Sequence, residues 1–435
     1  MKRAGLFAGL ALLVAAGIMW RARLHPAPAV PLAPAATPAK AAPAGTGGSL
    51  LGPGYFSPRP IGRPPEEAPW ITDLLIADLD GDGLKDIIVC DGRRNRVSWI
   101  RQTSPGVFAE QDIGETIAGP AHVEVADLDG DGHLDVLVAG MGVIPPSNAR
   151  TGAVVVLVND GRNHFSNRVL LHDVARVTYV AAAPLANSGR LDLVVGQFGY
   201  LEGEIRWMEN LGDGRFRSHQ LLDLPGTIHA PVADLDGDGH ADIVALVAQD
   251  AEEVHAFWGD ALGRFRDRVL YGSLNKDYGS SGLTLGDVNQ DGRPDIVYTN
   301  GDGFDYATPG SRPWHGVQWL ENLGGRKFAY HRVGDFPGAF SPVVTDLNGD
   351  GRPDIVASSC FNDWTDKNAV SLMGFENDGH GGFTPRILAH EPTHLVVVKA
   401  ADLFNDGRVE LVTGAFVFYP PYDRASRVTL WEHRP

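Results

Sequence analysis

Five short segments of the chain place acidic side chains at alternating positions beside glycine, in the pattern D-x-[DN]-x-D-G-x-x-D. The side chains at positions 1, 3, 5 and 9 can converge on one point with the carbonyl of position 7, and the glycine at position 6 permits a sharp turn. Ca²⁺ prefers six to eight hard oxygen ligands in a flexible geometry, which these groups supply. Carboxylates so close together repel one another without a cation, whereas a solvated Asp-Gly turn needs only one or two aspartates. The pattern therefore predicts calcium sites. The segments are DLDGDGLKD from Asp78, DLDGDGHLD from Asp127, DLDGDGHAD from Asp234, DVNQDGRPD from Asp287 and DLNGDGRPD from Asp346.

The segments recur at a regular spacing that indicates the elements around them. With two degraded copies, PLANSGRLD from Pro184 and DLFNDGRVE from Asp402, there are seven, separated by 49 to 59 residues. Each leads into an apolar run, then an alternating strand, then a Gly-rich turn that ends at Phe in six of the copies. No helical periodicity of useful length follows residue 50. Four-stranded units at this period predict an all-β, seven-bladed β-propeller of four-stranded blades.

The ends of the chain predict how the ring closes. The last repeat stops at VTLWEHRP and lacks its Phe strand, while the N-terminal side carries a spare copy, Tyr55-Phe56-SPRPIG. We expect this N-terminal strand to form the outer strand of the last blade, which would leave the ring without an exposed edge.

The acidic loops lie between two strands, and in this they resemble the FG-GAP (VCBS-type) repeats of integrin α-subunit propellers and of many bacterial secreted proteins. The resemblance covers essentially residues 51–435 and implies a calcium-binding propeller with about five Ca²⁺ sites. Carried over position by position, the implied ligands are Asp78, Asp80, Asp82, Leu84 and Asp86; Asp127, Asp129, Asp131, His133 and Asp135; Asp234, Asp236, Asp238, His240 and Asp242; Asp287, Asn289, Asp291, Arg293 and Asp295; and Asp346, Asn348, Asp350, Arg352 and Asp354. Leu84, His133, His240, Arg293 and Arg352 stand at position 7, where only the backbone carbonyl would bind.

Two repeats depart from the pattern. The third keeps only Asp192 of its four side-chain ligands, so we expect no metal there. The seventh has Phe404 at position 3 and Glu410 at position 9, which leaves its metal binding open. Histidine and cysteine are absent from the side-chain ligand positions, which disfavours transition metals.

The end of the propeller opposite the acidic loops is where we expect a ligand. Long insertions follow the second strand in the second, fifth, sixth and seventh repeats, and those of the last three hold aromatic residues, among them Trp314, Trp364 and Tyr419. Five residues before each first loop aspartate the blades place a mostly polar ring near the axis: Asp73, His122, Tyr179, His229, Gly282, Ser341 and Val397. Variable aromatic loops around polar groups are typical of a binding site. Alternatively, the aromatic residues only pack the long loops together.

The remaining features concern location and charge. Residues 1–23 have the form of a signal peptide or signal anchor, with a basic start and an apolar run, and residues 24–50 form a Pro/Ala-rich linker ahead of the propeller, 51–435. We therefore expect an extracytoplasmic protein, periplasmic, secreted or at the cell surface, which meets a membrane only through its N-terminal segment. The net charge of −17 disfavours nucleic acid as a partner. Cys90 and Cys360 each follow an apolar run and are expected to be free buried thiols.

Three functions remain open from the sequence. The leading one is a non-catalytic recognition or adhesion module for a protein or glycan ligand, as the resemblance implies. The second is a carbohydrate-active enzyme, a polysaccharide lyase or hydrolase, with Asp73, His122, Tyr179 and His229 supplying acid and base groups. No nucleophile motif, phosphate loop or zinc motif supports that enzyme. The third is a structural surface component.

Overall fold

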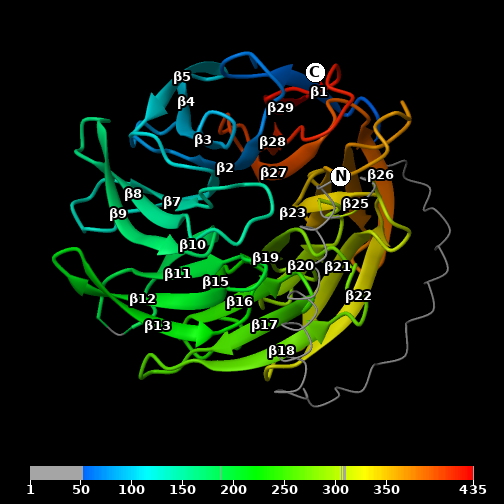
Figure 1. Cartoon of the computed structure of the whole chain (residues 1–435). Coiled ribbons are helices and arrows are strands. Elements are labelled where there is room, and N and C mark those ends of the chain that lie inside the picture. Colours follow the sequence, from blue (N-terminus) through cyan, green and yellow to red (C-terminus); the bar gives the residue numbers. More distant parts are fainter. Residues whose placement is uncertain (1–51, 187, 305, 307–309, 435) are drawn as a thin grey trace, which may run out of the picture. The chain divides into compact units, whose positions relative to one another are not determined.

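The computed structural model describes residues 52–434, except Asn187, Asp305 and residues 307–309. Its regular structure consists of strands arranged in seven antiparallel sheets, and the sheets surround one axis as the blades of a propeller (Figure 1). The predicted fold class is confirmed. The segments predicted as signal and linker, 1–23 and 24–50, lie outside the described residues. Within the part of the chain that the structure describes, no helix is long and apolar enough to cross a bilayer.

Each of the first six blades is built from consecutive strands, which run from the axis outward. Blade 1 contains β2 (Ile71–Ala77), β3 (Asp86–Asp91), β4 (Arg96–Ser104) and β5 (Val107–Ile113). Blade 2 contains β6 (Pro120–Ala126), β7 (Asp135–Gly140), β8 (Gly152–Asn159) and β9 (Phe165–Val174). Blade 3 contains β10 (Val177–Ala183), β11 (Asp192–Gln197), β12 (Glu204–Gly212) and β13 (Arg215–Leu222).

The innermost strand of blade 4 is divided in two around Pro231, which cannot donate a backbone hydrogen bond to the sheet. Blade 4 contains β14 (Thr227–His229) and β15 (Val232–Ala233), then β16 (Asp242–Val247), β17 (Glu253–Trp258) and β18 (Arg266–Gly272). Blade 5 contains β19 (Leu283–Gly286), β20 (Asp295–Thr299), β21 (Gly316–Asn322) and β22 (Phe328–Asp335). Blade 6 contains β23 (Ala339–Thr345), β24 (Asp354–Ser359), β25 (Leu372–Asn377) and β26 (Phe383–Ala389).

The seventh blade combines both ends of the propeller chain. It contains β27 (Leu395–Ala401), β28 (Glu410–Ala415), β29 (Val428–His433) and, as its outermost strand, β1 (Phe56–Pro60). β1 pairs antiparallel with β29, from Phe56 opposite His433 to Pro60 opposite Thr429. The innermost strand β27 in turn contacts β2 of blade 1.

The apolar core lies between the blades. Seven buried clusters each combine residues of two neighbouring blades, including the pair formed by blades 7 and 1. The repeated Trp and Phe of the sequence meet in these clusters: Trp99 of blade 1 packs on Phe165 of blade 2 with ring centroids 6.2 Å apart, and Trp319 of blade 5 packs on Phe383 of blade 6 at 6.1 Å. Edge-to-face pairs of this kind add about 1 kcal/mol to the burial of the rings.

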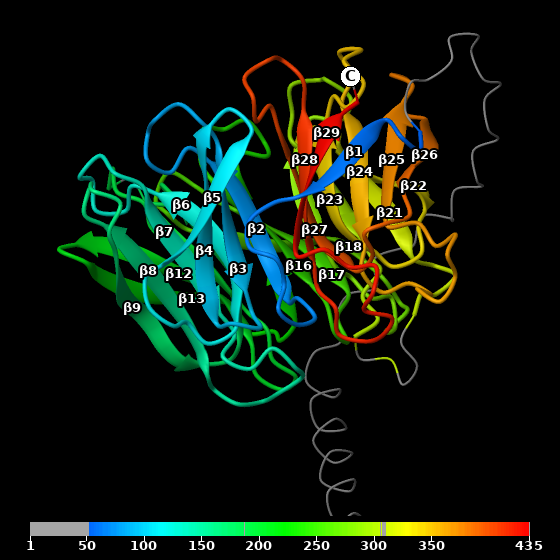
Figure 2. The same cartoon turned by 90° about the horizontal axis from the view of Figure 1, so that it is seen from above.

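The two ends of the propeller carry different connections, because all innermost strands run in the same direction. The acidic loops join the first strand of a blade to the second at what we name the acidic end. The connections from the second strand to the third lie at the opposite end, which we name the axial end. Figure 2 shows the strands from the side, with the connections at their two ends. Cys90 and Cys360 are buried free cysteines, as predicted.

Candidate functional site

The predicted side-chain ligands do come together in the acidic loops. In blades 1, 2 and 4 one carboxylate oxygen from each of three aspartates lies within 4.8 Å of the others; the sets are Asp78, Asp80 and Asp86; Asp127, Asp129 and Asp131; and Asp234, Asp236 and Asp242. In blades 5 and 6 the third position is an amide that bonds to the neighbouring carboxylate, Asn289 to Asp291 at 3.1 Å and Asn348 to Asp350 at 3.0 Å.

The first aspartate of each loop also fixes the loop backbone. Asp78 accepts hydrogen bonds from the amides of Asp82 at 3.1 Å and Gly83 at 2.8 Å, and Gly83 has the positive φ of 88° that glycine tolerates. The same two bonds recur at Asp127, Asp234, Asp287, Asp346 and Asp402. The fifth-position carboxylate accepts the amide of the position-7 residue in each intact loop: Leu84, His133, His240, Arg293 and Arg352.

The acidic residue at position 9 has a second task that the sequence pattern did not reveal. It is buried and accepts two backbone amides, one from its own loop and one from the end of the third strand. In the intact blades the loop amide belongs to position 2, and the residues that accept this pair are Asp86, Asp135, Asp242, Asp295 and Asp354. In blade 3, where the other ligands are missing, Asp192 accepts a corresponding pair, from Ala186 N at position 3 (2.8 Å) and from Asn210 N (2.7 Å). Position 9 is therefore an anchor of the blade as well as a potential ligand.

A repeated amide side chain completes this anchor. Asn210, at the end of the third strand, donates through Nδ2 to Leu191 O at 2.9 Å and accepts Gly212 N at 3.0 Å. Equivalent pairs of bonds are made by Gln102, Asn159, Asn322 and Asn377. Their recurrence just before the Gly-rich turn was the sequence signal that could have identified them.

Arginine side chains reach four of the five intact loops. Arg101 Nη2 lies 2.5 Å from Asp80 Oδ2 in blade 1, and Arg326, from the turn of blade 5, lies 2.5 Å from Asp236 of blade 4. Arg293 and Arg352 pair with the fifth-position aspartates of blades 5 and 6. Among residues 52–434, with the five omitted positions set aside, no arginine or lysine forms an ion pair with the aspartates of the blade 2 loop.

The loops fit a hard divalent cation. The atoms of these loops that could bind a metal are oxygens. The Asp80 side chain is only 3% exposed, and its Oδ1 accepts no hydrogen bond in the described structure. Burial raises the pKa of Asp86, Asp242, Asp295 and Asp354 to about 6, so these carboxylates are held in surroundings that disfavour their charge. A cation in the loop would offset that cost.

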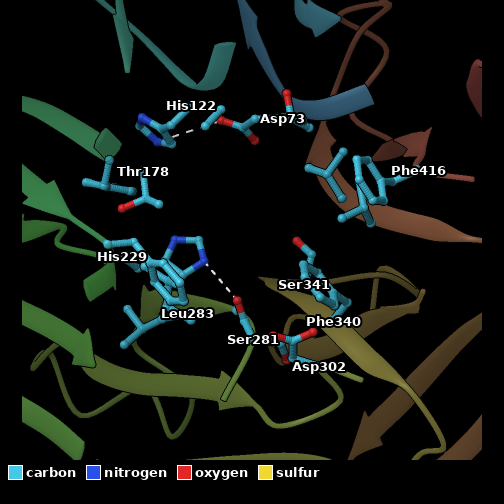
Figure 3. A pocket seen from close by; sticks show the side chains of 18 of the residues that line it. Asp73, His122, Thr178, His229, Ser281, Leu283, Asp302, Phe340, Ser341 and Phe416 are labelled. Atoms are coloured by element: carbon cyan, nitrogen blue, oxygen red, sulfur yellow. Dashed lines mark hydrogen bonds and ion pairs between the residues drawn. The ribbon is translucent and has the colours of Figure 1, made fainter. Parts of the chain in front are cut away.

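The axial end contains a cavity of about 290 Å³ at the centre of the ring. All seven ring positions named from the sequence line it: Asp73, His122, Tyr179, His229, Gly282, Ser341 and Val397. In Figure 3 the labelled side chains surround an open centre, with the histidines on one side and Phe340 and Phe416 on the other.

Bulges in the innermost strands place these ring residues. The register of the first strand shifts just before Asp73, His122, Tyr179, His229, Pro342 and Val397. A β-bulge re-aims the side chains beside it. In blades 1, 3 and 5, the residue just before the ring position carries a hydroxyl that donates to a carbonyl of the next blade: Thr72 to Pro120 O at 2.5 Å, Thr178 to Thr227 O at 2.7 Å, and Ser281 to Ala339 O at 2.8 Å.

The polar side of the cavity centres on Asp73. This carboxylate is 7% exposed, accepts Val123 N at 3.2 Å, and lies 3.7 Å from His122 Nε2 and 3.8 Å from Lys399 Nζ. Burial raises its pKa. Burial, with the charge of Lys399, lowers the pKa of His122 to about 3, and burial together with the neighbouring His122 lowers that of His229 to about 4. Both imidazoles are neutral at neutral pH.

The other side of the cavity is aromatic. Phe304, Phe361 and Phe416 come from the connections after the second strands of blades 5, 6 and 7, and Phe340 comes from β23. The ring of Phe304 packs edge-on against Phe361 at 5.9 Å and tilted against Phe416 at 6.2 Å. The long connections therefore form a continuous apolar wall that faces the polar groups.

The three aromatic residues singled out in the long loops do not line this cavity. Trp364 is 1% exposed and donates Nε1 to Cys360 O at 2.9 Å, because its loop folds back and buries the ring. Trp314 Nε1 donates to Asp277 O at 2.9 Å, and Tyr419 Oη donates to Asn362 O at 3.3 Å. These contacts hold the loops together.

Lys399 and Glu124 are charged groups on the axis that the sequence analysis missed. Each interrupts an otherwise apolar innermost strand, LVVVKAA and PAHVEVA, and this interruption was the available signal. Lys399 lines the cavity, and burial raises the pKa of Glu124 to about 7.

Comparison with known proteins identifies the repeats. A family model described as an FG-GAP-like repeat matches residues 52–138, 185–245 and 234–298. No curated protein matches the chain significantly.

Proposed function

Since the chain is an FG-GAP repeat β-propeller protein, we propose that it is a non-catalytic recognition module that binds a partner at its axial end. The observation that carries this proposal is the axial cavity. Its lining differs from blade to blade, while the acidic loops at the other end repeat nearly the same structure. A unique partner requires a unique surface, and the axial end offers one.

The acidic loops would hold Ca²⁺ in blades 1, 2, 4, 5 and 6, through the side chains at positions 1, 3, 5 and 9. The cation would supply positive charge to the carboxylates and tie the first strand of a blade to the second. Because arginine already offsets part of the charge in four of these loops, the blade 2 loop, from Asp127 to Asp135, should bind Ca²⁺ most tightly.

The proposed setting is extracytoplasmic. The support is the sequence of residues 1–50, with its basic start, apolar run and Pro/Ala-rich linker. In this arrangement the N-terminal segment would deliver or tether the propeller, and the axial end would meet a protein or a glycan partner.

The cavity favours binding over acid–base catalysis. A general base works best with a pKa near the operating pH. The pKa values of His122 and His229, about 3 and about 4, lie well below neutrality because both rings are buried. These residues suit hydrogen bonding to a ligand better than proton transfer.

The proposal is tested by screening glycan and peptide arrays with the protein and with two matched variants. Ser341→Phe would fill the cavity, and Ser188→Phe would place the same side chain on the exposed loop of blade 3. Ligands retained by the wild type and Ser188→Phe but lost with Ser341→Phe support recognition at the axial end. Ligands that Ser341→Phe retains equally well contradict it.

A further inference from the structure

The polar side of the axial cavity offers one open donor–acceptor pair. Asp73 Oδ1 and Lys399 Nζ both face the cavity at 3.8 Å from each other, too far for a direct hydrogen bond. The neighbouring hydroxyls of Thr72, Thr178 and Ser281 already donate to carbonyls of the next blade. A ligand hydroxyl placed between the two charged groups can donate to the carboxylate and accept from the ammonium at once. A protonated amine or an amide N–H could satisfy only the carboxylate.

The opposite side of the cavity requires an apolar body on the same ligand. Phe304, Phe340, Phe361 and Phe416 present ring faces and edges, and Val396 extends this wall. Aromatic rings pack on such a surface in offset or edge-to-face geometry. A sugar ring, by contrast, carries hydroxyls around its whole rim, and those facing the phenylalanines would lose their hydrogen bonds to water.

The volume of the cavity limits the size of the ligand. An apolar protein cavity of about 150 Å³ holds one benzene ring. At about 290 Å³, the axial cavity can hold one substituted ring or two fused rings.

We propose that the axial cavity binds a hydroxyl-bearing aromatic ring, with the hydroxyl bridging Asp73 and Lys399 and the ring against the phenylalanine wall. This inference rests on the proposed function and names the chemistry that the recognition site accepts. The ring belongs either to a free phenolic molecule or to a tyrosine side chain of a protein partner.

The primary experiment measures binding of 2-naphthol by calorimetry and by its own fluorescence. The comparison ligand is 2-methoxynaphthalene, which keeps the ring and the oxygen but cannot donate. A hydrogen bond to a charged group contributes about 1.5–3 kcal/mol, so 2-naphthol should bind about ten- to a hundredfold more tightly. Equal affinities for the two compounds would overturn the proposal.

Two variants locate the hydroxyl. Lys399→Met should weaken 2-naphthol binding about tenfold, and Asp73→Asn should act in the same direction. The control is Lys327→Met, an exposed lysine in the Gly-rich turn of blade 5, which should bind as the wild type does. Because Asp73 is buried and its replacement can disturb folding, Lys399→Met is the deciding variant, with its melting temperature measured alongside. Unchanged naphthol binding in folded Lys399→Met contradicts the proposal.

Further ligands distinguish the source of the ring. An acetylated, amidated Gly-Tyr-Gly peptide that competes with 2-naphthol, beside a Gly-Phe-Gly peptide that does not, assigns the site to a tyrosine side chain. Competition by free 4-ethylphenol alone assigns it to a small phenolic molecule. If methyl glucoside binds at the cavity and 2-naphthol does not, the proposed aromatic ligand is wrong, but the proposal that the axial end recognises a partner is not contradicted. If none of these ligands binds, the proposal of a hydroxyl-bearing aromatic ligand is contradicted. The array screen with Ser341→Phe tests the proposed recognition function independently.

Discussion

The acidic residue at position 9 separates the structural role of the loops from their role in metal binding. Asp192 lies in the blade that retains none of the other side-chain ligands, yet like its counterparts in the intact blades it accepts one amide of its own loop and one from the end of the third strand. This explains why blade 3 keeps an aspartate there although positions 1, 3 and 5 are Pro184, Ala186 and Ser188. The anchor is needed wherever a blade turns, with or without a cation.

Asp192→Asn should therefore destabilise the protein equally with and without calcium. The substitution turns one acceptor into a donor that faces a backbone N–H, which costs about 1–3 kcal/mol. Urea unfolding in millimolar Ca²⁺ and again in chelator measures the free energy of unfolding under both conditions.

The matched variant is Asp129→Asn in blade 2, at position 3, where the side chain is a potential ligand and accepts one amide, Asp131 N at 3.2 Å, which the asparagine oxygen can also accept. In Ca²⁺ this variant should have a lower free energy of unfolding than the wild type, because part of the stabilisation by calcium is lost. In chelator its free energy of unfolding should change little. A calcium-dependent effect of Asp192→Asn, or a calcium-independent effect of Asp129→Asn, would contradict this division of roles.

The His255 side chain provides a pH-dependent contribution to stability away from the acidic loops. It is buried between Glu253 and Asp267, at 3.0 and 2.8 Å. Burial alone would lower its pKa, but the hydrogen bonds and charges of the two carboxylates outweigh burial and raise the pKa to about 9. Because the folded pKa exceeds the unfolded value of about 6.5, the contribution is complete below pH 6.5 and is lost as the pH rises through 9.

His255→Gln should accordingly cost more stability in mild acid than in base. The variant and the wild type differ in their free energy of unfolding. The proton-linked part of this difference is up to about 3 kcal/mol at pH 6 and vanishes above about pH 9.5. Urea unfolding of both proteins across this range measures it. A difference between the two proteins that does not change with pH would show that folding does not raise the pKa of His255.

At the scale of elements, β1 is the strand whose role in the blade can be removed cleanly. Phe56 on β1 is 3% exposed, and Arg59 bonds to Glu432 of β29 at 3.0 and 2.8 Å. Removing residues 1–60 should cost at least about 3 kcal/mol from the lost Phe56 burial alone and leave β29 as an unpaired edge.

The control for this deletion removes residues 1–50 and keeps β1. We expect its melting temperature to match that of the full chain, while the shorter protein melts lower and associates. Light scattering during the melt detects the association. Equal melting temperatures for the two truncated proteins would show that β1 contributes little to blade 7.

Part of the arrangement of strands and of the axial cavity could be predicted from the sequence. The period of the acidic segments predicted seven sheets, and counting back five residues from each first aspartate predicted the ring from Asp73 to Val397, because strand register fixes such distances. The bulges before Asp73 and His122 were not predictable, since they depend on how the strand meets the next blade. The burial of Trp364 was not predictable either, because the path of a long loop depends on tertiary contacts rather than on local spacing.

At the scale of the whole molecule, the two ends of the propeller differ in structure. Its core is distributed over seven interfaces between blades, so each blade depends on both neighbours and on closure between blades 7 and 1. The acidic end concentrates negative charge in a repeated structure that stabilises individual blades. The axial end gathers one residue from each blade around a cavity.

The central claim is that the acidic loops bind calcium and thereby stiffen a scaffold that presents the axial cavity. The most direct measurement is the melting temperature of the protein in millimolar Ca²⁺ and after its removal with a chelator. Ligands that bind only the folded state raise stability by mass action, and several sites of similar affinity add their effects. The account predicts a large rise in melting temperature with Ca²⁺, reduced by Asp129→Asn. A melting temperature that is the same in Ca²⁺ and in chelator would contradict it.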